Sequence, residues 1–227
     1  MTTVYCFSGS GHSMAVASKL AELLGCALCP IEAKGEPDEI GTAVVVFPVY
    51  CQNLPKPVKA FLKRLQAAHV ALLATYGKIS YGNVLYEAQK LVRGEVIAGA
   101  YIPIGHTFLQ GDHTFDAACL LPLVERVNTP QRAVIPKCRK NPLANIAPAL
   151  RSRLSVKLTK DVRCTACGRC EKACPMGAIR NGRIGGACVR CLRCVSVCPE
   201  NALQAKNSRL LDWYLHRYRK EEYILYL

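Results

Sequence analysis

CTACGRCEKACP (residues 164–175) and CVRCLRCVSVCP (residues 188–199) repeat one spacing, Cys-x2-Cys-x2-Cys-x3-Cys-Pro. This is the ligand spacing of bacterial two-cluster iron–sulfur modules, in which the fourth Cys of each run binds the other cluster. The spacing therefore predicts two [4Fe–4S] sites. The first site takes Cys164, Cys167, Cys170 and Cys198. The second site takes Cys188, Cys191, Cys194 and Cys174.

Zinc sites or a disulfide framework are the other uses of such Cys runs. A zinc ion takes four ligands and has no need of the third closely spaced Cys in each run. Because the complete pattern occurs twice, we favour clusters. The segment resembles a bacterial dicluster ferredoxin. This resemblance implies a small α+β domain over residues 158–206 that transports electrons.

The first half of the chain alternates apolar strands with helical segments. Apolar runs, partly β-branched, predict strands at 3–7, 27–31, 42–47, 70–75 and 95–102. Apolar residues at helical spacing predict helices at 14–24, 58–65 and 81–92. This alternation predicts an α/β fold with a doubly wound parallel five-stranded sheet. Beyond residue 105 the pattern weakens, and we expect helices near 114–127 and 146–155.

The segment Ser8-Gly9-Ser10-Gly11-His12-Ser13 joins the first predicted strand to the first predicted helix. Gly residues allow close approach of the backbone, and the free N–H groups of a helix start attract an anion such as phosphate. A plain strand-to-helix turn would look the same, because the segment lacks the G-x-G-x-x-G of a dinucleotide fold. Two further loops, 48–58 and 75–77, leave the carboxyl ends of neighbouring strands, where ligands of such sheets bind.

Together these loops resemble the flavodoxin family, and more closely the fused flavodoxin–ferredoxin proteins of anaerobes. The resemblance implies a flavodoxin-like domain with FMN. The residues implied for the phosphate are Ser8, Ser10, Gly11, His12 and Ser13. Those implied for one side of the flavin ring are Pro48, Val49, Tyr50, Cys51 and Asn53, and for the other side Thr75, Tyr76 and Gly77. The chain departs from the family at His12, where Asn is usual, and in the neutral charge of its first half.

We expect four segments along the chain. They are a flavodoxin-like domain (1–130), a linker or helical connection (131–157), a 2[4Fe–4S] ferredoxin-like domain (158–206) and a C-terminal amphipathic helix (207–227). The last segment mixes apolar and basic side chains, so it either packs back on the body or lies on a membrane surface, and we favour packing.

The net charge of +14 lies entirely in the second half. Residues 1–130 hold ten Lys or Arg and ten Asp or Glu, whereas residues 131–227 hold twenty and six. Either this surface docks an acidic redox partner protein, or it compensates the clusters, whose eight thiolates leave about −4 in the oxidised state. We favour docking. A nucleic-acid partner is not expected, because no recognised motif or aromatic platform accompanies the charge.

No run of eighteen apolar residues occurs, so no membrane span is expected. The N-terminal residues lack the basic and apolar regions of a secretory signal, which favours the cytoplasm. There, fourteen Cys indicate metal ligands and free thiols. The oligomeric state stays open, with a dimer as one option.

The sequence thus predicts an iron–sulfur flavoprotein that passes electrons between two [4Fe–4S] clusters and FMN. The alternative is a ferredoxin-type carrier or relay without flavin or substrate. No catalytic residue is singled out, and an enzyme of this kind would be an FMN/iron–sulfur oxidoreductase. Four basic residues lie between or beside the Cys ligands and are expected to raise the cluster potentials: Arg169, Lys172, Arg190 and Arg193.

Overall fold

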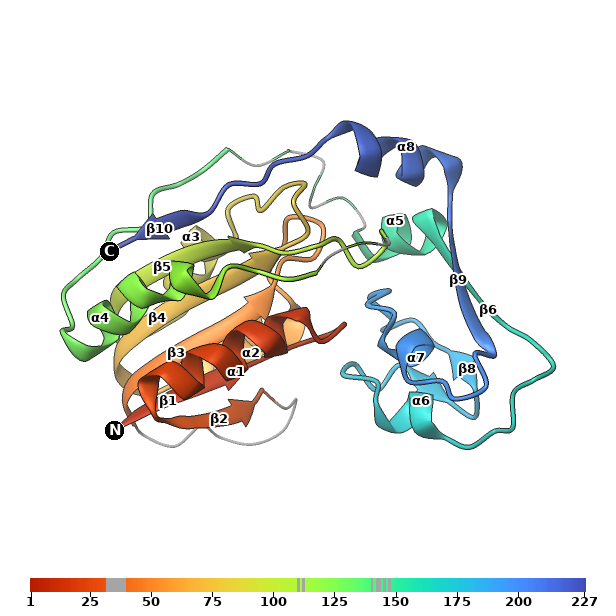
Figure 1. Ribbon diagram of the computed structural model, residues 1–227, viewed down its shortest axis with the longest axis horizontal. Coiled ribbons are helices and arrows are strands. Elements are labelled where there is room, and N and C mark those ends of the chain that lie inside the picture. Colours follow the sequence, from red (N-terminus) through yellow and green to blue (C-terminus); the bar gives the residue numbers. More distant parts are fainter. Residues whose placement is uncertain are drawn as a thin grey trace.

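The structure is a computed structural model that describes residues 1–31, 40–109, 111, 113–139, 141, 144, 146 and 148–227. Its largest element is a six-stranded sheet in the order β10-β5-β4-β3-β1-β2 (Figure 1). The strands are β1 (Thr2–Cys6), β2 (Ala27–Pro30), β3 (Ile40–Pro48), β4 (Ala67–Tyr76), β5 (Glu95–Pro103) and β10 (Ile224–Tyr226). The first five are parallel, which confirms the predicted α/β fold with five parallel strands, and β10 adds a sixth, antiparallel strand.

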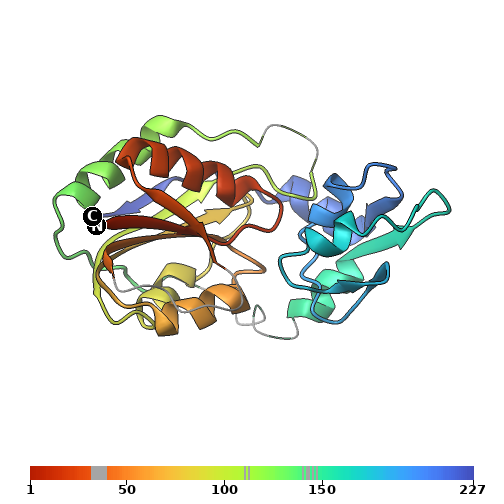
Figure 2. The same ribbon diagram turned by 90° about the horizontal axis from the view of Figure 1, so that it is seen from below.

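Helices cover both faces of this sheet (Figure 2). One face carries α1 (His12–Leu24) and α4 (Leu121–Asn128), the latter preceded by a short 3-10 helix, η1 (Ala117–Leu120). The other face carries α2 (Lys56–Arg64) and α3 (Val84–Gln89). Because both faces are covered, the run Val44–Val46 at the centre of β3 is completely buried. This β-branched run is the signal from which the sequence predicted a buried parallel strand.

The C-terminal segment differs from the expected single amphipathic helix over 207–227. Its helix, α8, covers only Arg209–Arg217 and is capped by Ser208, whose hydroxyl accepts the N–H of Leu211 at 3.3 Å. The chain then returns to the sheet, where β10 pairs antiparallel with β5. Side chains in this C-terminal stretch alternate between the two faces of the sheet. Tyr223 and Leu225 pack on the face that carries α1 and α4, and Ile224 and Tyr226 pack on the face that carries α2 and α3. The sheet therefore contains residues from both ends of the chain.

The cysteine-rich part lies between β6 (Val156–Lys160) and β9 (Leu203–Asn207), which pair antiparallel with each other. It also contains α6 (Arg169–Lys172), α7 (Arg193–Ser196) and a hairpin of β7 (Ile179–Arg180) and β8 (Arg183–Ile184). Its main apolar cluster is small, with Ile179, Cys194 and Leu203 as buried members, and the further buried apolar residues of this part are Val156, Ala178 and Ala202. This part sits beside the end of the sheet that is opposite to the two chain termini (Figure 1).

The helix α5 (Pro148–Ser155) leads directly into β6. It falls within the connection predicted over 131–157, of which residues 140, 142, 143, 145 and 147 lie outside the described residues. None of the helices in the described ranges combines the length and the apolar run that a bilayer crossing requires.

Candidate iron–sulfur centre

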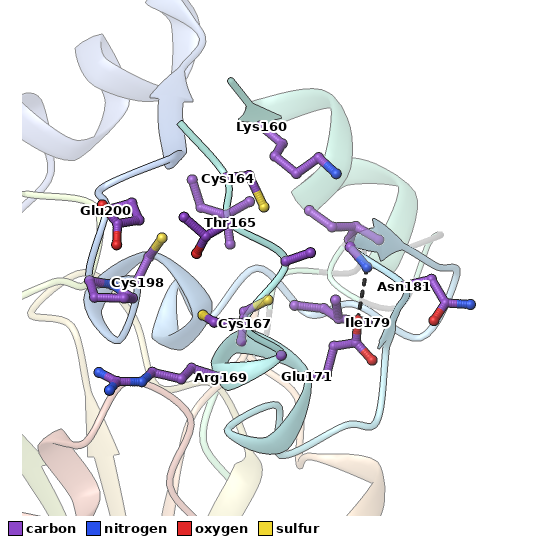
Figure 3. A pocket seen from close by; sticks show the side chains of 17 residues that line it. Lys160, Cys164, Thr165, Cys167, Arg169, Glu171, Ile179, Asn181, Cys198 and Glu200 are labelled. Atoms are coloured by element: carbon purple, nitrogen blue, oxygen red, sulfur yellow. Dashed lines mark hydrogen bonds between the residues drawn. The ribbon is translucent and has the colours of Figure 1, made fainter. Parts of the chain in front are cut away.

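The four Cys assigned to the first site line one cavity of about 240 Å³. Figure 3 shows the sulfur atoms of Cys164, Cys167 and Cys198 around this space, and Cys170 completes the lining. Lys160, Glu171 and Glu200 are also among its lining residues. Cys167 is exposed, so this cavity lies at the surface of the cysteine-rich part.

The four Cys assigned to the second site line a narrower cavity. Its thiols belong to Cys174, Cys188, Cys191 and Cys194, and its apolar walls include Leu158, Met176 and Ile179. Cys194 is only 7% exposed, and Met176 packs against the core of the sheet part. The second site therefore has a buried Cys and lies next to the six-stranded sheet and its helices, whereas the first has an exposed Cys.

The two Cys runs share one backbone conformation. Ala166 and Arg190 hold equivalent positions in the two runs and have φ values of 54° and 59°. Gly168 and Leu192 are also equivalent, with φ values of 74° and 61°. Left-handed residues are uncommon outside Gly, so their recurrence indicates loops that must curl tightly. The sequence repeat is thus a structural repeat around two similar spaces.

Hydrogen-bond donors point at several of these sulfur atoms. The backbone N–H of Ala178 donates to Cys174 Sγ at 3.2 Å, and Arg190 Nη1 donates to Cys188 Sγ at 3.3 Å. Burial raises the pKa of the Cys198 thiol, but three backbone N–H groups nearby outweigh it, so that this pKa is lowered. Such donors stabilise thiolates, which are the form that binds iron.

Crowding has the opposite effect at the second site. Burial first, and then the neighbouring thiols of Cys191 and Cys188, raise the pKa of Cys194 to about 11. Four thiolates in such a space need a compensating positive charge, and an iron–sulfur core supplies one. Within the described residues, no three or more His, Cys, Asp or Glu side chains are arranged to hold a single metal ion.

The loop predicted to hold a flavin phosphate begins α1. Gly11 precedes the helix with φ of 110°, and no side chain caps the helix start. The Ser8 hydroxyl instead accepts the N–H groups of Gly11 and Met14 at 3.1 and 3.3 Å. Ser10 Oγ lies 3.2 Å from His12 Nδ1. An uncapped helix start beside hydroxyls and an imidazole fits an anion.

Three His side chains gather at this loop, of which the sequence indicated only His12. The rings of His12 and His113 stack with centroids 4.3 Å apart. Burial, and then the charges of His113 and His12, lower the pKa of His106 to about 4. His106 Nδ1 also accepts the N–H of Phe108 at 3.2 Å, which favours its neutral form. The spacing of His106 and His113 in the sequence gave no signal of this cluster, which depends on the path of the chain after β5.

The loops predicted to flank a flavin ring touch each other. A Cβ added to Gly82, in the loop after β4, would lie 2.8 Å from Gln52 Cβ. A Cβ on Gly77 would clash with the His106 ring. Tyr76 is 2% exposed and donates its hydroxyl to the carbonyl of Glu222, so its ring belongs to the core. A flavin ring between these loops would have to part these contacts.

The other residues predicted to contact the flavin ring also make contacts within the chain. Asn53 Nδ2 donates to the Ala144 carbonyl at 2.9 Å, and Cys51 Sγ lies 3.3 Å from Ser152 Oγ of α5. Thr75 Oγ1 lies 2.8 Å from Ser13 Oγ. Pro48 ends β3, and the N–H of Val49 donates to the Thr75 carbonyl at 2.8 Å. The phosphate end of the predicted FMN site thus offers groups that suit an anion, whereas the residues predicted for the ring end contact other parts of the chain.

One contact in this region was not foreseen from the sequence. Gly9 packs against Cys191, and Arg193 Nη1 donates to the Ser8 carbonyl at 3.4 Å. The second Cys site therefore lies directly against the loop that follows β1. No pattern in the sequence could indicate this, because it depends on how the two parts dock.

Comparisons with known proteins agree with the Cys pattern. Residues 162–180 and 185–204 match the family model described as 4Fe-4S binding domain. No curated protein matches the chain. Two similar solved structures are candidate flavoproteins from Bacteroides species. That from Bacteroides uniformis is 18% identical, covers 46% of this chain and 91% of its own, and has a TM-score of 0.36. That from Bacteroides eggerthii is 15% identical, covers 56% and 98%, and has a TM-score of 0.40. The cysteine-rich part thus carries the features of iron–sulfur electron transfer.

His106 makes the stability of the folded chain sensitive to acid. Its folded pKa of about 4 lies below the usual 6.5, so the unfolded chain binds more protons between these values. Stability therefore falls as the pH drops through this window, by about 1 kcal/mol between about pH 7.5 and pH 5.5 for this residue. His106→Gln should reduce the difference in unfolding free energy between about pH 7.5 and pH 5.5 by about 1 kcal/mol. The measurement is urea unfolding of the iron-loaded protein, followed by far-UV circular dichroism. His216→Gln, on exposed α8, should leave the difference unchanged. An unaltered difference in His106→Gln would contradict the prediction.

Proposed function

We propose that this chain is an electron carrier or relay with two [4Fe–4S] clusters, each held by three Cys of one run and the fourth Cys of the other. The observation that carries this proposal is the lining of the two cavities. One is lined by Cys164, Cys167, Cys170 and Cys198, and the other by Cys174, Cys188, Cys191 and Cys194. Each cavity thus combines Cys from both runs, as the spacing predicts.

Held by these two sets of Cys, the clusters would supply one-electron couples between an oxidised 2+ and a reduced 1+ core, so that the chain would take one electron at a time from a donor protein and pass it to an acceptor. The open first site is the natural entry, because Cys167 is exposed. Arg169 and Lys172, both exposed, flank it on α6. A donor with an acidic face would be attracted to this surface. The second site would receive the electron next. We also propose a cytoplasmic location, because none of the fourteen Cys forms a disulfide.

An iron–sulfur flavoprotein is the second candidate. The uncapped start of α1, with His12 beside it, favours a flavin phosphate at this loop. Against it stands the contact between Gln52 and Gly82, which the flavin ring would have to open. We therefore place the carrier first and FMN second.

The composition of the anaerobically purified chain tests both candidates. About eight iron and eight sulfide per chain without flavin is expected for the carrier. The same iron with about one FMN per chain would establish the flavoprotein instead. A colourless or zinc-containing protein would refute both.

Paired Cys variants test the exchange of the fourth ligand. Cys174→Ser with Cys191→Ser removes two ligands of the second site only, so about four iron per chain should remain. Cys174→Ser with Cys167→Ser damages both sites, and nearly all iron should be lost. The measurement is iron and sulfide content after anaerobic reconstitution. If the two double variants exchanged these results, Cys174 would belong to the first site.

Arg190 is expected to raise the potential of the second cluster. Its guanidinium donates to Cys188 Sγ, and both the charge and the hydrogen bond favour the more negative reduced state. Arg190→Ala should therefore lower one midpoint potential in an EPR-monitored redox titration. Arg209→Ala removes the same charge from exposed α8 and should shift neither potential. Unchanged potentials in Arg190→Ala would contradict the prediction that Arg190 raises the potential of the second cluster.

A further inference from the structure

The hydroxyl of Tyr50 is buried without a partner. Tyr50 follows β3, and its ring packs edge-on against Phe7 with centroids 6.5 Å apart. Its Oη is shielded from solvent and has no hydrogen-bond partner in the described part of the chain. A buried hydroxyl without a partner costs about 1–3 kcal/mol. Such a group is retained more easily when a bound ligand satisfies it.

Gly9 shows where this hydroxyl lies. A Cβ added to Gly9 would clash with Tyr50 Oη and would stand 2.6 Å from Cys191 Cβ. The Tyr50 hydroxyl and the Cys191 side chain thus both lie next to the Cα atom of Gly9. Only a residue without a side chain leaves room for both, so Gly9 is required here for the approach of the cysteine-rich part.

The chemistry of the neighbourhood limits what the hydroxyl can bond. The phenol of Tyr50 carries one hydrogen that it can donate. The Ser8 carbonyl already accepts from Arg193 Nη1. A thiolate sulfur bound to iron is a good acceptor for such a donor.

We propose that Tyr50 donates its hydroxyl hydrogen bond to Cys191 Sγ when the second Cys set holds its cluster. This inference rests on the proposed function. It makes Tyr50 a tuning residue that reaches the cluster from the sheet part and stabilises the reduced core. The sheet part thereby sets the potential of the second cluster, and any displacement of the two parts lowers it.

Tyr50→Phe tests the inference in a chain that holds only the second cluster. Cys164→Ser provides this background, because Cys164 belongs to the first site whichever run supplies the fourth ligand. Adding Tyr50→Phe should lower the midpoint potential in an EPR-monitored titration. It should also remove one exchangeable proton coupling, identified by comparing ENDOR spectra of the reduced cluster in H2O and in D2O. Tyr86→Phe, on the far side of α3, is the matched control and should change neither.

Gly9→Ala provides a second variant that leaves Tyr50 in place. Its Cβ should part the hydroxyl from Cys191 and give the same lowered potential and lost coupling. Iron content is measured in every variant. Absence of about four iron in the Cys164→Ser background would refute the proposed function itself. A loaded cluster with an unchanged potential and coupling in Tyr50→Phe would refute only the role of Tyr50.

Discussion

The constraint on which the rest of the structure depends is the poor apolar core of the cysteine-rich part. Only Ile179, Cys194 and Leu203 are buried members of its cluster. Segments of this size seldom fold without disulfides or metals, and its thiols form no disulfide. Crowded thiols raise the pKa of Cys194 instead of stabilising the fold. Under the proposed function, metal ligation supplies the missing folding free energy, so that electron transfer and stability both depend on the same eight side chains.

The six-stranded sheet and its helices support the cysteine-rich part through the connections and contacts between the two. Strands β6 and β9 pair with each other where the chain enters and leaves that part, and β10 then completes the sheet. Met176 and Cys191 contact the sheet part directly. The second Cys site is thus supported from two sides, whereas the first is open on the surface. This asymmetry gives the two sites different surroundings even though their loops repeat.

The sequence was sufficient wherever local pattern decides structure. Continuous apolar runs such as Val44–Val46 indicated the parallel strands, and Cys spacing indicated which thiols gather around each cavity. Sequence patterns were not sufficient where contacts between distant segments determine the structure. The strand β10 has three residues and is too short to be recognised from the sequence pattern. The closed loops at Gln52 and Gly82, and the gathering of His106 and His113 at His12, depend on contacts between distant segments. Gly9 illustrates the difference. In the sequence, its lack of a side chain indicated a phosphate site, whereas in the structure it also leaves room for Cys191.

The position of β10 imposes an order of assembly. Ile224–Tyr226 follow both Cys runs in the chain, yet they cover the edge of β5. During synthesis, the ribosome releases these residues only after the Cys runs have emerged. Until then the edge of β5 presents unpaired backbone groups to the solvent, which invites wrong pairing. The sheet therefore reaches its complete set of strands only after both Cys runs have been synthesised.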